Sequence, residues 1–257
     1  MKTQIKGTTM PVLLIGLEPN DRIVAEPGEF SWMTDAVQLR TTPLTAGARG
    51  LWGAIGRALS GGGLFMTEYS APAGNGVVAF AAKLPGAILQ VDVPAGHSYM
   101  IHRHGFLCGT EGLQLSTGFQ RSLGAGIFGG SGFLLQKLSG PCTAWVELGG
   151  EVVTYDLAPG ETLNVHPGHI GMFQDSVGFD ITLMRGVTNA LFGGDGLFIA
   201  RLTGPGKVWL QTLTVPALAH ALSPYLAGEA SHRPDAGTVV GAGLAGAVLR
   251  DVFGNDR

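Results

Sequence analysis

The chain has 257 residues, of which 42 are glycine and 14% are charged, and its formal net charge is −3. An ordinary soluble protein has about 25% charged residues. The 16 basic residues form no cluster, which argues against nucleic-acid binding. No apolar stretch approaches the roughly 20 residues of a membrane-spanning helix. Two cysteines form no disulfide framework, so we expect a reducing, cytoplasmic location.

In chain order, the sequence predicts three tandem β-modules, at residues 10–84, 85–148 and 149–213. Segment 128–133 (FGGSGF) matches segment 192–197 (FGGDGL) at an offset of 64 residues, and Trp145 matches Trp209 at the same offset. A third, degenerate copy stands near residue 61, and the first module carries an insertion at 42–60. Repetition at a fixed period indicates that one structural unit occurs several times.

Each module is predicted to consist of short strands separated by turns. Apolar runs that end at Pro or Gly are typical of strands. They occur at 12–17, 88–93, 152–157, 177–183, 196–202 and 208–213. Such a pattern favours an all-β, jelly-roll-like fold. Six glycines of the two GGxG elements are predicted to be structural turn positions. They are Gly129, Gly130, Gly132, Gly193, Gly194 and Gly196.

The tail at 214–257 is predicted to be helical and is rich in Gly and Ala. One helix is expected just after Thr214, with Pro216 at its first position. A second is expected at 237–253, where small residues recur every four positions and permit close helix contact. A third helix is expected within the insertion, at 48–59.

Seven short elements in order resemble the altered-inheritance-of-mitochondria type 24 family. They are Pro27-Gly28-Glu29, Gly63-Leu64-Phe65, Arg103-His104-Gly105-Phe106-Leu107, Phe128-Gly129-Gly130 with Gly132-Phe133, Gly168-His169-Ile170, Leu191-Phe192-Gly193-Gly194-Asp195-Gly196-Leu197, and Gly204-Pro205-Gly206 with Val208, Leu210-Gln211-Thr212. The resemblance implies three shortened double-stranded β-helix modules like those of the trp RNA-binding attenuation protein, assembled as ring-like trimers. It implies no catalytic residue and no cofactor.

The histidines are the sharpest candidates for chemistry. The spacing from Gly96 to His102 and His104 resembles the opening of a cupin metal motif, and imidazoles at i and i+2 of a strand point the same way. The nearest following acid is Glu111, which recurs as an acid in all three modules and is better explained as a turn residue. A metal site at these histidines would make the protein a metal-dependent, cupin-like enzyme.

Two further metal hypotheses come from the repeat and from local spacing. Glu26, His102 and His166 occupy the same position in the three modules, and two His with one carboxylate could bind iron. They would meet only if all three face a shared axis. His166 and His169 could also chelate locally, although a turn with two satisfied histidines is the simpler interpretation.

The remaining patterns favour an architectural function. Cys108 and Cys142 lie in apolar runs typical of inert buried thiols. We therefore predict a non-enzymatic, homo-oligomeric β-scaffold without a cofactor. The alternatives are the cupin-like enzyme that uses His102 and His104 and a membrane-surface organiser. A protein or membrane-surface partner is expected to bind through residues 215–257.

Overall fold

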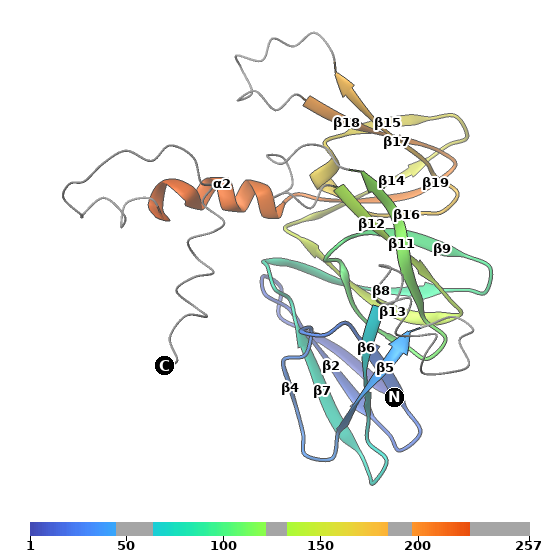
Figure 1. Ribbon diagram of the computed structural model, residues 1–257, viewed down its shortest axis with the longest axis vertical. Helices are drawn as coiled ribbons and strands as arrows, with labels where there is room; N and C mark the ends of the chain where they lie inside the picture. The colour runs from blue at the N-terminus through green and yellow to red at the C-terminus, as the bar shows by residue number, and fades with distance from the viewer. Residues whose placement is uncertain (45–63, 122–132, 185–196, 227–257) are drawn as a thin grey trace, which may run out of the picture. The chain divides into compact units, whose positions relative to one another are not determined.

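The computed structural model describes residues 1–44, 64–121, 133–184 and 197–226 (Figure 1). These residues form nineteen strands in four antiparallel sheets, one short 3-10 helix and one α-helix. The predicted all-β fold is therefore confirmed. The helix predicted in the insertion, at 48–59, and the helix predicted in the tail, at 237–253, lie outside the described residues. So do the six turn glycines of the GGxG elements.

After β1 (Lys2–Lys6), the strands fall into three groups of six. Group 1 consists of β2 (Val12–Leu17), β3 (Arg22–Ala25), β4 (Trp32–Met33), β5 (Gln38–Leu44), β6 (Leu64–Ser70) and β7 (Gly76–Ala81). Group 2 consists of β8 (Gly86–Val93), β9 (Ser98–His102), β10 (Phe106–Thr110), β11 (Gln114–Arg121), β12 (Phe133–Ser139) and β13 (Cys142–Gly149). Group 3 consists of β14 (Val152–Leu157), β15 (Thr162–Val165), β16 (Ile170–Gln174), β17 (Gly178–Met184), β18 (Leu197–Thr203) and β19 (Gly206–Gln211), with the 3-10 helix η1 (Pro167–His169) before β16.

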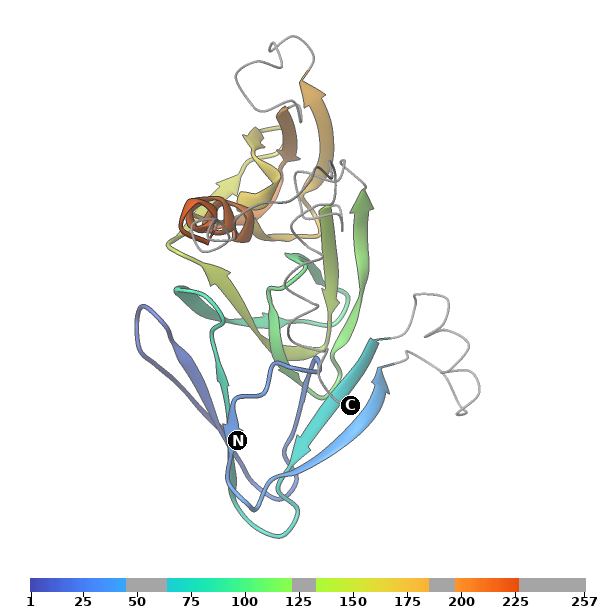
Figure 2. The same ribbon diagram turned by 60° about the vertical axis from the view of Figure 1, so that its left-hand side comes forward.

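Strands pair in the same order in every group. The first, sixth and third strands form one three-stranded unit, and the second, fifth and fourth form another. Groups 1 and 2 join where β3 pairs with β10, and groups 2 and 3 join where β9 pairs with β16, which creates two six-stranded sheets (Figures 1 and 2). The strand β1 is an addition, because it pairs with the outer edge of β2. The finer identification as double-stranded β-helix modules stays a prediction.

Equivalent side chains make equivalent hydrogen bonds in the three groups. In each, the residue at or just after the end of the third strand accepts a hydrogen bond from a backbone N–H near the start of the sixth strand. The pairs are Val77 N to Thr34 Oγ1 at 3.0 Å, Thr143 N to Thr110 Oγ1 at 3.0 Å and Lys207 N to Gln174 Oε1 at 2.8 Å. This correspondence fixes which positions match one another along the chain.

Three hydrophobic clusters form the core, and residues cross from one group into the cluster of the group before it. Cys108 and Trp145 of group 2 lie in the cluster built mainly by group 1. Met172 of group 3 lies in the cluster built mainly by group 2. Complete burial of side chains of this size stabilises a fold by roughly 1.5–3 kcal/mol each. The joints between groups are therefore part of the core.

The α-helix α2 (Val215–Leu226) confirms the helix predicted after Thr214. Thr214 caps it, since its Oγ1 accepts a hydrogen bond from the N–H of Ala217 at 3.2 Å. Pro216 occupies the second helical position rather than the predicted first. Three large apolar side chains of α2 are exposed: Val215, Leu222 and Tyr225. No helix among the described residues is long and apolar enough to cross a lipid bilayer.

Candidate functional site

The imidazole of His102, at the end of β9, is held inside the fold. Its Nε2 donates a hydrogen bond to the carbonyl oxygen of Glu147 at 3.1 Å. A side chain at Gly105 would place a Cβ 2.8 Å from this ring, so glycine permits the close approach. Burial lowers the pKa of His102 to about 4, although the bond to Glu147 opposes the shift. The ring is therefore neutral at pH 7, and its Nε2 is already used.

The neighbouring His104 lies beyond β9, in the turn before β10. Burial lowers its pKa as well, with Arg103 and Lys83 acting in the same direction. Its position differs from the predicted one, because only His102 of the two belongs to the strand. The i, i+2 argument for parallel imidazoles on one strand therefore does not apply to this pair.

The three equivalent residues Glu26, His102 and His166 have different surroundings. Glu26 Oε1 accepts a hydrogen bond from Gln136 Nε2 at 2.8 Å, whereas His102 bonds to Glu147. Burial raises the pKa of Glu26, and the bond from Gln136 opposes that shift. Among the described residues, no group of three or more His, Cys, Asp and Glu side chains is arranged to hold a metal ion.

His166 directly precedes the short helix η1, and His169 is its last residue. Their ring centroids are 5.8 Å apart at an interplanar angle of 70°. His169 Nδ1 donates to the carbonyl oxygen of Gln211 at 2.8 Å, which ties the turn to β19. Burial lowers the pKa of His166, and the neighbouring His169 adds to the effect. The two rings do come together, as their spacing predicted, within a turn held by hydrogen bonds.

A cluster of charged residues, which no pattern in the sequence predicted, links groups 1 and 2. The ammonium of Lys83 lies 2.7 Å from both carboxylate oxygens of Glu29 and 2.7 Å from Glu147 Oε1. The backbone N–H of Lys83 also donates to Glu147 Oε2 at 3.0 Å. Burial raises the pKa of Glu29, and the bond from Lys83 opposes the rise. All three charges have partners, so the cluster connects the loops that carry Glu29 and Lys83 to the strand β13.

Neither thiol is activated. Cys108 is buried, and burial raises the pKa of its thiol well above the usual value. Burial also raises the pKa of Cys142 to about 11. A nucleophilic cysteine needs a lowered pKa, so both thiols have the inert character that the sequence predicted.

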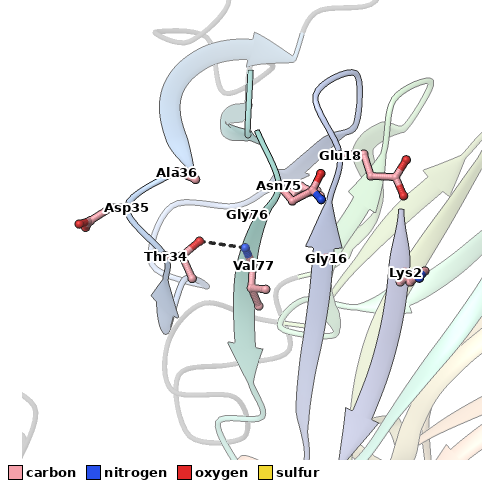
Figure 3. A pocket seen from close by; sticks show the side chains of 10 residues that line it. Lys2, Gly16, Glu18, Thr34, Asp35, Ala36, Asn75, Gly76 and Val77 are labelled. Carbon is pink, nitrogen blue, oxygen red and sulfur yellow. Dashed lines mark hydrogen bonds between the residues drawn. The ribbon is translucent and has the colours of Figure 1, made fainter. Parts of the chain in front are cut away.

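An open hollow of about 460 Å³ lies between the ends of β1, β2 and β7 and the segment that follows β4 (Figure 3). Lys2, Glu18, Thr34, Asp35 and Asn75 contribute to its lining. Thr34 is engaged with the backbone N–H of Val77, as the dashed line in Figure 3 shows. Asp35, by contrast, points away from the strands. The charges do not converge on one point, so the hollow has no arrangement typical of a catalytic site.

The strand β4, which ends just before the lining residue Thr34, carries a large apolar side chain that is half exposed. Trp32 is 51% exposed, whereas its equivalents Cys108 and Met172 are 0% and 1% exposed. Those two equivalents are covered because β10 and β16 each join the preceding group through a paired strand. In the described residues, β4 ends its sheet without such a partner, and so does β15 at the other end of the series. These two edges form the candidate interaction surface.

Comparison with known proteins identifies a family and a solved structure with a similar fold. A family model described as mitochondrial biogenesis AIM24 matches residues 3–213. The structure is similar to the crystal structure of protein SPYM3_0169 from Streptococcus pyogenes, with a TM-score of 0.69 at 23% sequence identity. The similarity covers 87% of this chain and 99% of the streptococcal one. At this identity the likeness concerns the fold alone. A search of curated proteins gives no significant match.

Proposed function

The chain belongs to the family described as mitochondrial biogenesis AIM24, and from that premise we propose that it is a non-enzymatic scaffold assembled from several copies of itself. The observation that carries the proposal is Trp32. This large apolar side chain is half exposed at a position where its two internal equivalents are buried by an adjoining group of strands. Burial of a similar side chain in a second copy would remove apolar surface from water.

Two features of the chain support an architectural function over a catalytic one. The charged cluster that links groups 1 and 2 is internally paired, because Lys83 forms ion pairs with Glu29 and Glu147. His102, on which the cupin-like alternative depends, uses its Nε2 in a bond to the backbone. In the described part of the chain, these ionisable side chains therefore make contacts that stabilise the fold.

Size-exclusion chromatography with light scattering tests the proposal on the full-length chain. The resemblance to ring-forming proteins leads us to expect a particle of three times the 26.6 kDa of one chain. A mass of one chain across a concentration series from nanomolar to tens of micromolar would refute the scaffold. A different multiple would keep the assembly and revise its number of copies.

A second candidate function, docking of a protein partner through the tail, is favoured by the exposed apolar side chains Val215, Leu222 and Tyr225 of α2. A chain truncated after Thr214 retains all nineteen strands. We expect it to keep its strand-rich circular dichroism and to lose partner binding. If flotation with liposomes instead depends on the tail, the partner is a membrane surface and the protein-docking version is wrong.

A further inference from the structure

We infer that β15 of one copy pairs with β4 of a second copy, antiparallel and in the register of the two joints within the chain. The inference rests on the proposed self-assembly and names the strands that produce it. It places Asn164 opposite Met33 of the second copy, with Val165 opposite Trp32 and Leu163 opposite Thr34. The partner is thus a second copy of this chain, added head to tail.

The two internal joints have the same register. At the first, Val24 of β3 lies opposite Gly109 of β10. At the second, Met100 of β9 lies opposite Phe173 of β16. These are equivalent residues, because Met100 follows Val24 by the 76 residues that separate Glu26 from His102, and Phe173 follows Gly109 by the repeat offset of 64. The register is therefore a property of the repeating unit.

The same offsets identify the residues at the two free edges that are equivalent to the paired residues of the internal joints. Asn164 is the group 3 equivalent of Met100, and Met33 is the group 1 equivalent of Gly109. Both belong to strands that end their sheets in the described part of the chain: β15 in the order β15-β18-β17 and β4 in the order β1-β2-β7-β4. An unpaired edge strand offers free backbone groups to another chain. Each copy thus has a free β4 edge in group 1 and a free β15 edge in group 3. Pairing of β15 with β4 of the next copy is a heterologous contact that repeats from copy to copy.

A polar pair at the second joint has a matching counterpart at the proposed one. Ser98 Oγ donates to Asp175 Oδ2 at 2.7 Å, and the N–H of Asp175 donates to the carbonyl oxygen of Ser98 at 3.1 Å. The equivalents of these residues are Thr162, at the start of β15, and Asp35, just after β4. A hydroxyl again faces a carboxylate, and both residues are exposed in the single chain. The donor and acceptor therefore suit the inferred pairing.

Apolar surfaces at the two edges also match. Cys108 and Met172 each lie in the core cluster of the preceding group. In the inferred assembly, group 3 of one copy precedes group 1 of the next copy. Trp32 is therefore expected to cover the group 3 cluster of the neighbouring copy. That cluster has partly exposed apolar residues at its margin. They include Leu163 of β15, Phe179 of β17 and Phe198 of β18. The last core in the series thus keeps apolar surface that a tryptophan from the next copy would bury.

Disulfide cross-linking tests the register directly. In a Cys142→Ser background, one batch of protein carries Met33→Cys and a second carries Asn164→Cys. Directly opposed residues of an antiparallel pair have Cβ atoms about 4.5–5.5 Å apart, and disulfides need Cα atoms about 4.4–6.8 Å apart. After the batches are mixed, allowed to exchange subunits and oxidised, we expect a covalent dimer. Each batch oxidised alone is expected to give none.

The outcomes separate this joint from the proposed function. A double variant with both cysteines should form covalent ladders beyond the dimer, because each chain then links on both sides. If the double variant forms only an internal disulfide, β15 pairs with β4 of its own chain and the inference is wrong. If the chain is oligomeric by light scattering but the mixture gives no covalent dimer, the assembly stands and this joint is wrong. A monomer by light scattering refutes both.

Discussion

Replacement of Trp32 by alanine should weaken self-association strongly. A tryptophan buries up to about 250 Å² when it is fully covered. Since 51% of Trp32 is exposed in the single chain, roughly 120 Å² remains to be buried in a joint. At about 25 cal/mol per Å², this area contributes about 3 kcal/mol, which corresponds to a roughly 100-fold change in the dissociation constant of each joint.

Sedimentation velocity over a concentration series measures this change. Tyr155→Ala provides a matched control, because Tyr155 is 42% exposed on β14, a strand outside the inferred joint. Circular dichroism of both variants checks that each copy keeps its strands. The reasoning is refuted if Trp32→Ala associates as tightly as the wild type, or if Tyr155→Ala weakens association by as much.

Two further predictions concern the single chain. Met172→Ala should lower the free energy of unfolding by about 2–5 kcal/mol in urea titrations, because Met172 is 1% exposed and lies in the core cluster of group 2. The control Met10→Ala, at a 51% exposed position, should change the free energy of unfolding little. Equal effects of the two substitutions would contradict the placement of Met172 in that cluster. For His102, a pKa of about 4 in the folded chain against 6.5 when unfolded makes the unfolded state bind the proton first. Its contribution is complete above pH 6.5 and is lost as pH falls toward 4, by at most about 3 kcal/mol, so His102→Asn should flatten the stability–pH curve in that window. An unchanged slope would show that other groups cause the acid sensitivity.

The sequence predicted six of the nineteen strands, because apolar runs that end at Pro or Gly are local signals. The runs at 12–17 and 152–157 correspond to β2 and β14, and the run at 208–213 begins two residues late and ends two residues late relative to β19 (Gly206–Gln211). The repeat also supplied the equivalence of positions. From that equivalence, each residue of the edge strands β4 and β15 has a known counterpart in the other groups. The pairing of β3 with β10, in contrast, is visible only in the structure.

The cluster of Lys83, Glu29 and Glu147 could not be predicted, because contacts between residues 54 and 64 positions apart leave no local signal in the sequence. The hydrogen bond between Glu26 and Gln136 spans 110 residues for the same reason. Trp32 did carry a signal. A tryptophan stands where the other groups have Cys108 and Met172, and such a mismatch among equivalent core positions indicates a different environment.

Asp175 shows the limit of the turn interpretation. Its recurrence with Asp35 and Glu111 correctly predicted a turn, since residues 175 and 176 form one before β17. Its carboxylate also binds Ser98 across a joint, 77 residues away. A polar residue can satisfy the local requirement of a turn and a distant one at the same time, and a repeat alone reveals only the first.

Hydrogen–deuterium exchange of the intact protein tests the head-to-tail joint most directly. If β4 and β15 pair between copies, peptides that cover 31–35 and 162–166 should be protected together at high concentration. Dilution, or the substitution Trp32→Ala, should release both segments in parallel while β9 and β16 stay protected within the chain. Rapid exchange of both segments in an assembled particle would contradict the account.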